Sequence, residues 1–152
     1  DEDLSRWMFA AAAHNRLLTK ELNQVRVMEY ELKEYLNSGV LFMNLPLQRK
    51  HRNEDDIFDF VEKYKNRLIL PDQDVLNYLY SKNIKKLNEI KYNYDARYYR
   101  YYRLTSNGKV NMDYVMRNTV ILHFCGKKKP WHENYSGEFH SLYKHYEKLA
   151  FG

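Results

Sequence analysis

The stretch Val120-Ile121-Leu122-His123-Phe124-Cys125-Gly126-Lys127-Lys128-Lys129-Pro130-Trp131 predicts a short buried strand that ends in polar residues. Its first residues are apolar and strand-forming, a glycine turn follows His123, and a proline ends the lysine run. The His123 imidazole is a candidate metal ligand, the backbone at Gly126 can approach an oxyanion, and Lys129 can neutralise a diphosphate. This layout predicts a phosphate-binding strand end. The alternative is a structural histidine with solvated lysines beside it.

Length and composition bound the class of protein. With 152 residues, 44% of them hydrophobic and 30% charged, we expect a single domain over residues 1–152 with its own core. The net charge of +5 favours an anionic partner such as nucleotide phosphate, nucleic acid or acidic lipid. The single cysteine, Cys125, excludes an internal disulfide and is compatible with a reducing compartment. No apolar stretch has transmembrane length, so we expect a cytoplasmic protein.

Apolar runs and helix-like periodicities alternate along the chain. The predicted strands cover residues 7–13, 40–45, 68–70, 84–87 and 120–122. The predicted helices cover residues 15–35, 53–64, a segment that begins at Pro71, 111–117 and 139–149, and residues 91–94 are a predicted loop. This alternation, with polar motifs at strand ends, predicts an α/β domain whose ligand site lies at those ends. The strands are too few for a complete doubly wound sheet.

The first upstream motif is Tyr35-Leu36-Asn37-Ser38-Gly39-Val40-Leu41. A polar turn with a glycine leads here into an apolar strand, so Asn37 and Ser38 lie where the strand begins. Both are candidates for ligand contact. A turn of this type also needs small polar residues for backbone reasons alone, and the sequence leaves the two interpretations open.

The second upstream motif is Asp72-Gln73-Asp74-Val75-Leu76-Asn77, directly after Pro71. A proline and an acid before an apolar periodic segment are typical of a helix start. Asp72 is then a candidate N-cap, and Asp74 a first-turn residue that matches the helix dipole. Those local roles leave Gln73 without an explanation.

The segment Arg97-Tyr98-Tyr99-Arg100-Tyr101-Tyr102-Arg103 places an arginine at every third position between tyrosine pairs. Cationic runs with stacking side chains bind single-stranded nucleic acid or carbohydrate. The favoured interpretation is an amphipathic segment whose tyrosines cover the edge of the core. A basic, tyrosine-rich nucleic-acid-binding module, or a non-catalytic structural module, stays the alternative function.

Three of these motifs, in this order, resemble the C-terminal half of glycosyltransferase family 8. The family comprises retaining nucleotide-sugar transferases that include glycogenin and bacterial lipopolysaccharide galactosyltransferases. The matched segments are residues 35–41, 72–77 and 123–131, with a weaker match at 91–93. The resemblance covers nearly the whole chain and is closest to the bacterial members. It implies a partial Rossmann-like α/β nucleotide-sugar transferase fold, a mixed sheet flanked by helices, with the N-terminal nucleotide-binding half missing.

The resemblance implies how the phosphate-binding strand end is used. His123 would complete the coordination of Mn²⁺, or another divalent cation, that bridges the diphosphate of a UDP-sugar donor. Gly126 and Lys129 would bind that diphosphate. Metal and lysine together suit this role, because both stabilise the charge that grows on a departing nucleoside diphosphate.

The resemblance also implies roles for the two upstream motifs. Asn37 and Ser38 would bind the donor sugar. The catalytic residues would be Asp72, which hydrogen-bonds that sugar, and Gln73, which lies close to the anomeric carbon. Because glutamine is a poor nucleophile, retention would proceed by same-face attack of the acceptor, assisted by the diphosphate oxygens.

The function implied is a retaining hexosyltransferase that moves a hexose from a UDP-sugar to a glycan or lipopolysaccharide-type acceptor. The expected partners are the nucleotide-sugar donor and the carbohydrate acceptor, without nucleic acid, and a homo-oligomer is left open. The half of the family that carries an Asp-x-Asp metal-binding pair has no match in this sequence. Since His123 alone should bind a hard divalent ion weakly, we expect this chain by itself to lack transferase activity.

Overall fold

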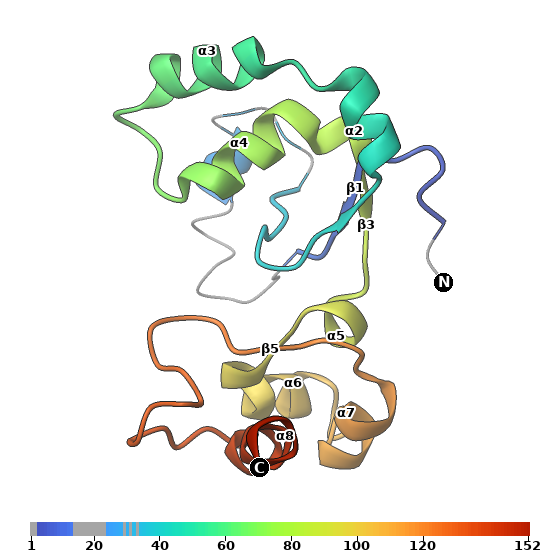
Figure 1. The fold of residues 1–152 in the computed structure, drawn as a ribbon, viewed down its shortest axis with the longest axis vertical. Helices are drawn as coiled ribbons and strands as arrows, with labels where there is room; N and C mark the ends of the chain where they lie inside the picture. Colours follow the sequence, from blue (N-terminus) through green and yellow to red (C-terminus); the bar gives the residue numbers. More distant parts are fainter. Residues whose placement is uncertain (1–2, 14–23, 29, 31, 33) are drawn as a thin grey trace. The chain divides into compact units, whose positions relative to one another are not determined.

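The computed structural model describes residues 3–13, 24–28, 30, 32 and 34–152, and the chain forms two compact units (Figure 1). The N-terminal unit is Asp1–Glu89 and the C-terminal unit is Ile90–Gly152. Of the helix predicted over residues 15–35, residues 24–28 are helical and residues 30, 32, 34 and 35 are not; the remaining positions lie outside the described residues. The single domain predicted for residues 1–152 stays a prediction. Within the described part of the chain, no helix is long and apolar enough to cross a membrane.

The N-terminal unit is built on a three-stranded mixed sheet with the order β2-β1-β3. Strand β1 (Phe9–Ala11) pairs antiparallel with β2 (Phe42–Met43) and parallel with β3 (Ile84–Lys86). The central strand is buried throughout, and its alanines have no side chain beyond Cβ, so helices can approach it closely. The core cluster around β1 therefore includes Leu36 and Leu76 from outside the sheet.

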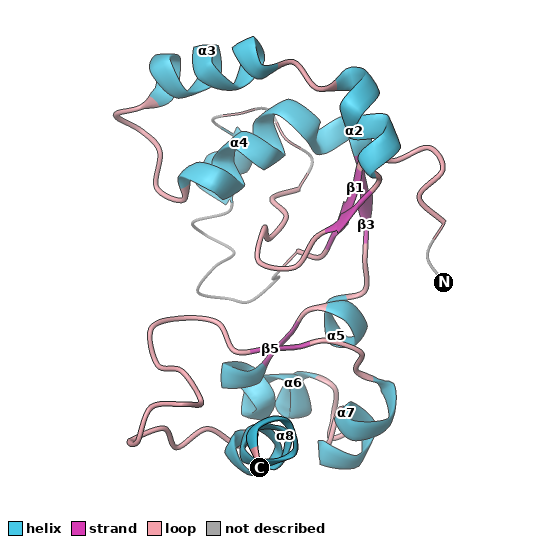
Figure 2. Cartoon of the chain, viewed as in Figure 1, coloured by secondary structure: helices cyan, strands magenta, loops and turns pink. Residues whose placement is uncertain are grey.

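Four helical segments follow β2 in the N-terminal unit. They are α2 (Leu45–His51), α3 (Glu54–Tyr64), α4 (Pro71–Tyr80) and the 3₁₀ turn η1 (Ser81–Asn83). As predicted, Asn53 caps α3, with its side-chain oxygen accepting a hydrogen bond from the Asp55 N–H at 3.2 Å. Helix α3 packs on α4, where the Phe60 and Tyr78 rings stack with centroids 4.4 Å apart. Figure 2 shows α3 running alongside α4.

The C-terminal unit is built around two short parallel strands and several helices. The elements are α5 (Glu89–Tyr92), β4 (Tyr94–Asp95), η2 (Ala96–Tyr98), α6 (Tyr99–Thr105), α7 (Met112–Asn118), β5 (Leu122–His123) and α8 (His140–Phe151). Strands β4 and β5 pair in parallel. Buried Tyr94, Tyr102 and Phe139 form the centre of its core. The predicted helix start at Asn111 is confirmed, since its side chain accepts from the Tyr114 N–H at 2.9 Å.

Several predicted segments differ from the structure. The strand predicted over residues 40–45 is limited to β2, and Leu45 begins helix α2. Residues 68–70 form a loop instead of a strand, because a side chain takes the N–H groups of Ile69 and Leu70 that a sheet would need. Residues 91–94 are divided between helix α5 and strand β4 and are not a loop. The predicted strand over 120–122 is reduced to β5, since the N–H groups of Val120 and Ile121 both bond to the Lys91 carbonyl instead of a regular ladder.

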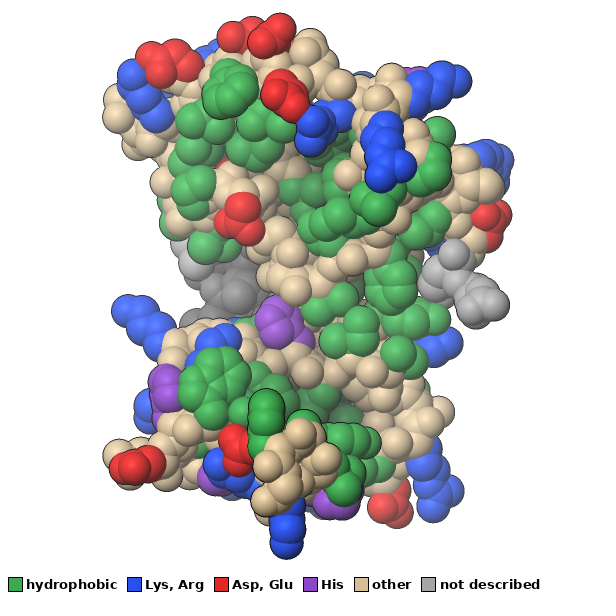
Figure 3. All heavy atoms as spheres, in the orientation of Figure 1, with side chains coloured by type: hydrophobic (Ala, Val, Ile, Leu, Met, Phe, Trp, Pro, Cys, Tyr) green, Lys and Arg blue, Asp and Glu red, His purple; other side chains and the backbone are tan. Residues whose placement is uncertain are grey.

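Several large apolar side chains of the predicted helices are exposed. Figure 3 shows hydrophobic side chains at the surface of both units. The exposed apolar residues within the predicted helices include Val25, Met28, Phe58, Val61, Tyr146 and Leu149. On α3, the buried residue is Phe60.

Candidate active site

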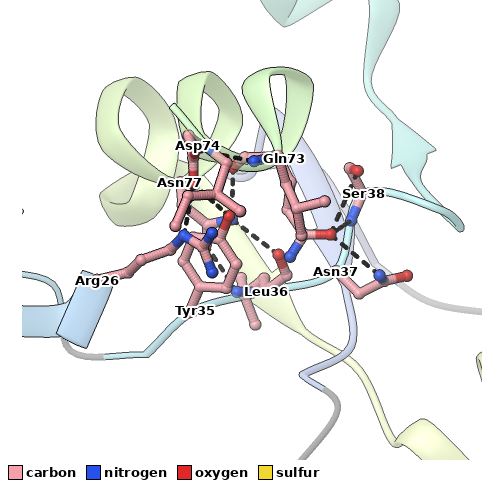
Figure 4. A network of polar contacts seen from close by, with 10 residues as sticks. Arg26, Tyr35, Leu36, Asn37, Ser38, Gln73, Asp74 and Asn77 are labelled. Atoms are coloured by element: carbon pink, nitrogen blue, oxygen red, sulfur yellow. Dashed lines mark hydrogen bonds and ion pairs between the residues drawn. The ribbon is translucent and has the colours of Figure 1, made fainter. Parts of the chain in front are cut away.

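The first upstream motif lies at the end of the central strand. The Asn37 N–H donates to the Ala12 carbonyl at 2.9 Å, directly after β1. One residue earlier, Leu36 is bound to the side chain of Asn77 on α4 (Figure 4). The polar turn that contains Asn37 and Ser38 is therefore fixed between the end of β1 and the first turns of α4. Ligands of open α/β sheets bind at such strand ends.

Four of the predicted site residues form one hydrogen-bonded group, the Gln73 cluster, made of Asn37, Ser38, Asp72 and Gln73. The Gln73 Oε1 atom accepts from Asn37 Nδ2 at 3.0 Å and from the Ser38 N–H at 3.2 Å. The Ser38 hydroxyl donates to Asp72 Oδ2 at 2.7 Å. Figure 4 shows the Gln73 side chain directed at this turn. The structure thus brings together residues that lie more than thirty positions apart in the sequence.

The Gln73 cluster differs from the predicted local roles in one respect. Asp72 is not the N-cap of α4, because Leu70 occupies that position without a side-chain bond and Asp72 lies in the first turn. Its carboxylate is exposed and is bound to Ser38. The exposed Asp72 carboxylate and the half-buried Asn37 amide offer both acceptors and donors. This mixture suits the hydroxyl groups of a sugar.

A buried network around Asp74 holds the cluster in place. Asp74, which is 0% exposed, accepts at Oδ1 from the Tyr35 hydroxyl at 2.5 Å and from Arg26 Nε at 3.0 Å. Its Oδ2 atom accepts from the N–H groups of Ile69 and Leu70 at 3.0 and 3.2 Å. Burial, together with the Asp74 hydrogen bond, raises the pKa of Tyr35 well above its usual range. Asp74 therefore fixes the start of α4, and its carboxylate does not reach a ligand.

In the C-terminal unit, the parallel register places Asp95 of β4 opposite His123 of β5. The side-chain oxygen of buried Asn93 lies 2.8 Å from His123 Nδ1. Because a carbonyl oxygen only accepts, Nδ1 carries the hydrogen and Nε2 carries the lone pair. Metal-binding histidines are usually oriented in this way through their second nitrogen.

The Gly126 loop, defined as residues 124–129, follows β5. Gly126 adopts a φ of +81°, a conformation that favours glycine. The Lys129 ammonium donates to the Phe124 carbonyl at 2.8 Å, so the lysine side chain folds back along its own loop. Gly126, Lys129 and His123 therefore belong to one short segment. Within seven positions, this segment carries an imidazole, a glycine with positive φ and a lysine ammonium.

The described residues fit the metal expected from the resemblance only in part. The tautomer that Asn93 imposes on His123 fits a single metal ligand. Among the described residues, no group of three His, Cys, Asp or Glu side chains could hold a metal ion. The described part of the chain therefore offers one oriented ligand, which is short of a complete site.

In the tyrosine-rich segment, residues 97–103, the tyrosines cover the edge of the core, as the favoured interpretation predicts. Two of its arginines form ion pairs, Arg97 with Asp95 at 2.7 Å and Arg100 with Glu138 at 3.1 Å. The tyrosines in or packed against the C-terminal core are Tyr98, Tyr99, Tyr101 and Tyr102. Stacking on a row of bases needs exposed rings, so the nucleic-acid alternative is not favoured.

Three residues that support the candidate site were not identified as such from the sequence. They are Asp74, Asn77 and Asn93. One signal was present for two of them. Asp74 and Asn77 lie three residues apart on a helix whose neighbouring positions are apolar, and polar side chains on such a face are buried only when they are hydrogen-bonded.

Comparison with known proteins places the chain in a family. The model of glycosyl transferase family 8 matches residues 4–135, and the chain belongs to this family. It is 29% identical over 143 residues to General stress protein A of Bacillus subtilis (strain 168), covering 90% of this chain and 46% of that protein. It is 32% identical over 120 residues to a Lipopolysaccharide 1,2-glucosyltransferase of Escherichia coli, covering 72% of this chain and 33% of that protein.

Solved structures show the same fold. The crystal structure of the galactosyltransferase LgtC in complex with donor and acceptor sugar analogs matches with a TM-score of 0.72 and 24% identity, over 98% of this chain and 54% of LgtC. The glycosyltransferase GlyE of Streptococcus pneumoniae TIGR4 matches with a TM-score of 0.64 and 22% identity, over 96% of this chain and 33% of GlyE. The predicted α/β fold, a mixed sheet flanked by helices, is confirmed. The chain spans about half the length of these relatives or less.

Proposed function

We propose that this chain is part of a retaining hexosyltransferase, which transfers a hexose from a UDP-sugar to a glycan or lipopolysaccharide-type acceptor. One observation carries the proposal. In a chain that belongs to glycosyl transferase family 8, the Gln73 side chain is bound through Oε1 to the Asn37–Ser38 turn at the end of the central strand. A lipopolysaccharide glucosyltransferase and a galactosyltransferase among the similar proteins support the acceptor and donor classes.

In this proposal the Gln73 cluster binds the donor hexose. The exposed carboxylate of Asp72 accepts hydrogen bonds from sugar hydroxyls, and Ser38 already fixes its orientation. Gln73, which is buried and bonded to two residues, holds the adjacent surface rigid near the anomeric carbon. A preorganised polar surface of this kind stabilises the transition state without having to reorient during the reaction. The acceptor would then attack the anomeric carbon on the same face from which the diphosphate departs.

The Gly126 loop binds the donor diphosphate in this proposal. Lys129 would release the Phe124 carbonyl and donate to a phosphate oxygen, while the backbone at Gly126 approaches the same group. His123 would ligate a divalent cation, Mn²⁺ in the first instance, through Nε2. When bound, the cation supplies positive charge to the departing diphosphate. A cytoplasmic location and the oligomeric state stay predictions, as does the single domain over residues 1–152.

Turnover by the full-length protein tests this assignment. Release of labelled hexose from UDP-glucose and UDP-galactose should fall by about 100-fold or more in Gln73→Ala and Lys129→Ala, since each removes a group that faces developing charge or the reacting carbon. Lys148→Ala on α8 is the matched control, because it removes a charge outside both sites. Unchanged turnover in both site variants would sink the assignment.

A metal measurement separates the role of His123 from a structural one. Binding of Mn²⁺ to the full-length protein, followed by its effect on water proton relaxation, should weaken about 10-fold to 100-fold in His123→Ala. Asn93→Ala should weaken it in the same direction without removing the ligand itself. Equal Mn²⁺ affinity in all three proteins would remove His123 from the metal site.

A further inference from the structure

Arg97, which the family motifs do not include, is rigidly held beside the Gly126 loop. Buried Asp95 accepts at Oδ1 from the Arg97 N–H at 3.1 Å and from Arg97 Nε at 3.0 Å. Its Oδ2 atom accepts from Arg97 Nη2 at 2.7 Å. Two parallel bonds to one carboxylate fix the plane of a guanidinium group. The orientation of Arg97 is therefore determined by the strand that precedes it.

The opposite edge of the guanidinium lies against Gly126. A Cβ atom built on Gly126 would lie 2.6 Å from Arg97 Nη1 and 3.4 Å from Arg97 Cζ. Only a residue without a side chain leaves room for this contact. The Arg97 side chain is also 42% exposed, so it is in contact with solvent. Gly126 thus gives a cation access to the backbone of the loop.

Two cationic groups therefore meet at the same turn. Lys129 lies along the loop through its bond to the Phe124 carbonyl, and Arg97 reaches it from η2. A diphosphate carries at least two negative charges, more than one lysine neutralises. Arg97 is suited to share that load, because its guanidinium keeps its positive charge and Nη1 lies on the edge that Asp95 does not occupy.

We propose that Arg97 is a diphosphate-binding residue, which donates from Nη1 to a phosphate oxygen at the Gly126 loop while Asp95 holds its other edge. The inference rests on the proposed function, in which this loop receives the donor diphosphate. Asp95 is then a positioning residue that acts through Arg97. It keeps the guanidinium oriented before the ligand arrives, so little side-chain freedom is lost on binding.

Binding of inorganic pyrophosphate to the 152-residue chain tests the inference without a sugar or an acceptor. The affinity is followed by the amide shifts of residues 124–129 in two-dimensional NMR spectra. Arg97→Gln should weaken pyrophosphate binding about tenfold or more, as expected for the loss of a hydrogen bond to a charged group. Arg97→Lys keeps the charge but loses the pair of bonds by which Asp95 orients the group. Its affinity for pyrophosphate should lie between those of the unchanged chain and Arg97→Gln.

Two further variants keep the test decisive. Arg97→Gln leaves a buried carboxylate without its partner, so the double variant Asp95→Asn with Arg97→Gln is measured as well, because it removes both charges. Arg103→Gln is the charge-matched control, since this exposed arginine of α6 lies outside the Gly126 loop and should change the affinity less than twofold. A folded double variant that binds pyrophosphate within twofold of the unchanged chain would overturn the inference. So would an unchanged chain that binds none.

The failure of this inference differs from the failure of the proposed function. If hexose release by the full-length protein depends on Lys129 but not on Arg97, the inference fails and the transferase assignment stands. If pyrophosphate binding depends on Arg97 but no UDP-sugar is turned over, the anion site stands and the transferase assignment fails.

Discussion

The side-chain amide of Asn77 binds both backbone polar groups of Leu36. Asn77 Oδ1 accepts from the Leu36 N–H at 2.7 Å, and Asn77 Nδ2 donates to the Leu36 carbonyl at 2.7 Å and to the Gln73 carbonyl at 2.8 Å. Asn77 is fully buried. An asparagine on α4 thus replaces the neighbouring strand that would otherwise satisfy this segment, and it fixes the chain one residue before Asn37.

Asn77→Asp should destabilise the N-terminal unit strongly. The substitution preserves shape but replaces two donors with an acceptor that faces the carbonyls of Leu36 and Gln73. We expect the free energy of unfolding to fall by about 2 to 4 kcal/mol, measured by urea denaturation. Asn118→Asp is the matched control, because its amide donates to the Tyr114 carbonyl at an exposed position and its loss should stay under about 1 kcal/mol. Equal losses in the two variants would contradict the role of Asn77.

Asp74→Asn tests the buried network. This change removes the negative charge that compensates Arg26, whose side chain is 6% exposed. Breaking a buried ion pair from one side costs about 3 to 5 kcal/mol, and we expect a loss of unfolding free energy in that range. The second substitution Arg26→Gln in the same chain should recover part of the loss, since no buried charge is then uncompensated. Asp72→Asn, at an exposed position, is the control. A double variant less stable than Asp74→Asn alone would argue against this account.

Gly126→Ala and Gly108→Ala form a matched pair. Both glycines have positive φ, +81° and +80°, so both alanines pay the same backbone cost of about 1 to 2 kcal/mol. A Cβ on Gly108 meets nothing within 4 Å, whereas a Cβ on Gly126 meets Arg97. Thermal unfolding should therefore show a larger loss for Gly126→Ala. When both glycine substitutions are made in an Arg97→Ala chain and compared with that chain, their losses of stability should be close together. A persistent difference would mean that another contact is responsible.

Alkaline conditions should destabilise the protein through Tyr35. Because the pKa of Tyr35 is raised in the folded state, its contribution to stability is complete below the ordinary tyrosine pKa of about 10 and is lost as pH rises above it. The unfolding free energy should fall by up to about 1.4 kcal/mol per pH unit for this group. Tyr35→Phe should lower stability at pH 8 but flatten the decline above pH 10. Tyr146→Phe, at an exposed position, should leave that slope unchanged.

Local rules predicted the elements whose causes are local. The Asn53 cap and the Pro71 helix start need only neighbouring residues, and both helices are present. The apolar run 68–70 has the composition of a strand but lacks a strand partner, because the Asp74 carboxylate takes its N–H groups. Composition does not reveal such a competitor. The limits of short strands are hard to predict for the same reason, since they depend on pairing with a second chain segment.

In the candidate site, too, some residues could be predicted from the sequence and others could not. The resemblance selected Asn37, Ser38 and Gln73, and the structure joins their side chains in one cluster. The residues that hold a site in place contact other protein groups, so their importance depends on distances that only the folded chain defines. Arg97 is the clearest case, because its significance arises from a glycine nearly thirty positions away.

The long separation between the bonded residues has a consequence for folding kinetics. The hydrogen bonds of the Gln73 cluster and of Asn77 join positions 34 to 41 residues apart, across the segment that contains α2 and α3. Closing such a loop costs chain entropy before any of these bonds forms. We infer that this end of the sheet is assembled late, after the helices. Substitutions there should then accelerate unfolding more than they slow refolding, so the donor surface would be the first part of the N-terminal unit to open.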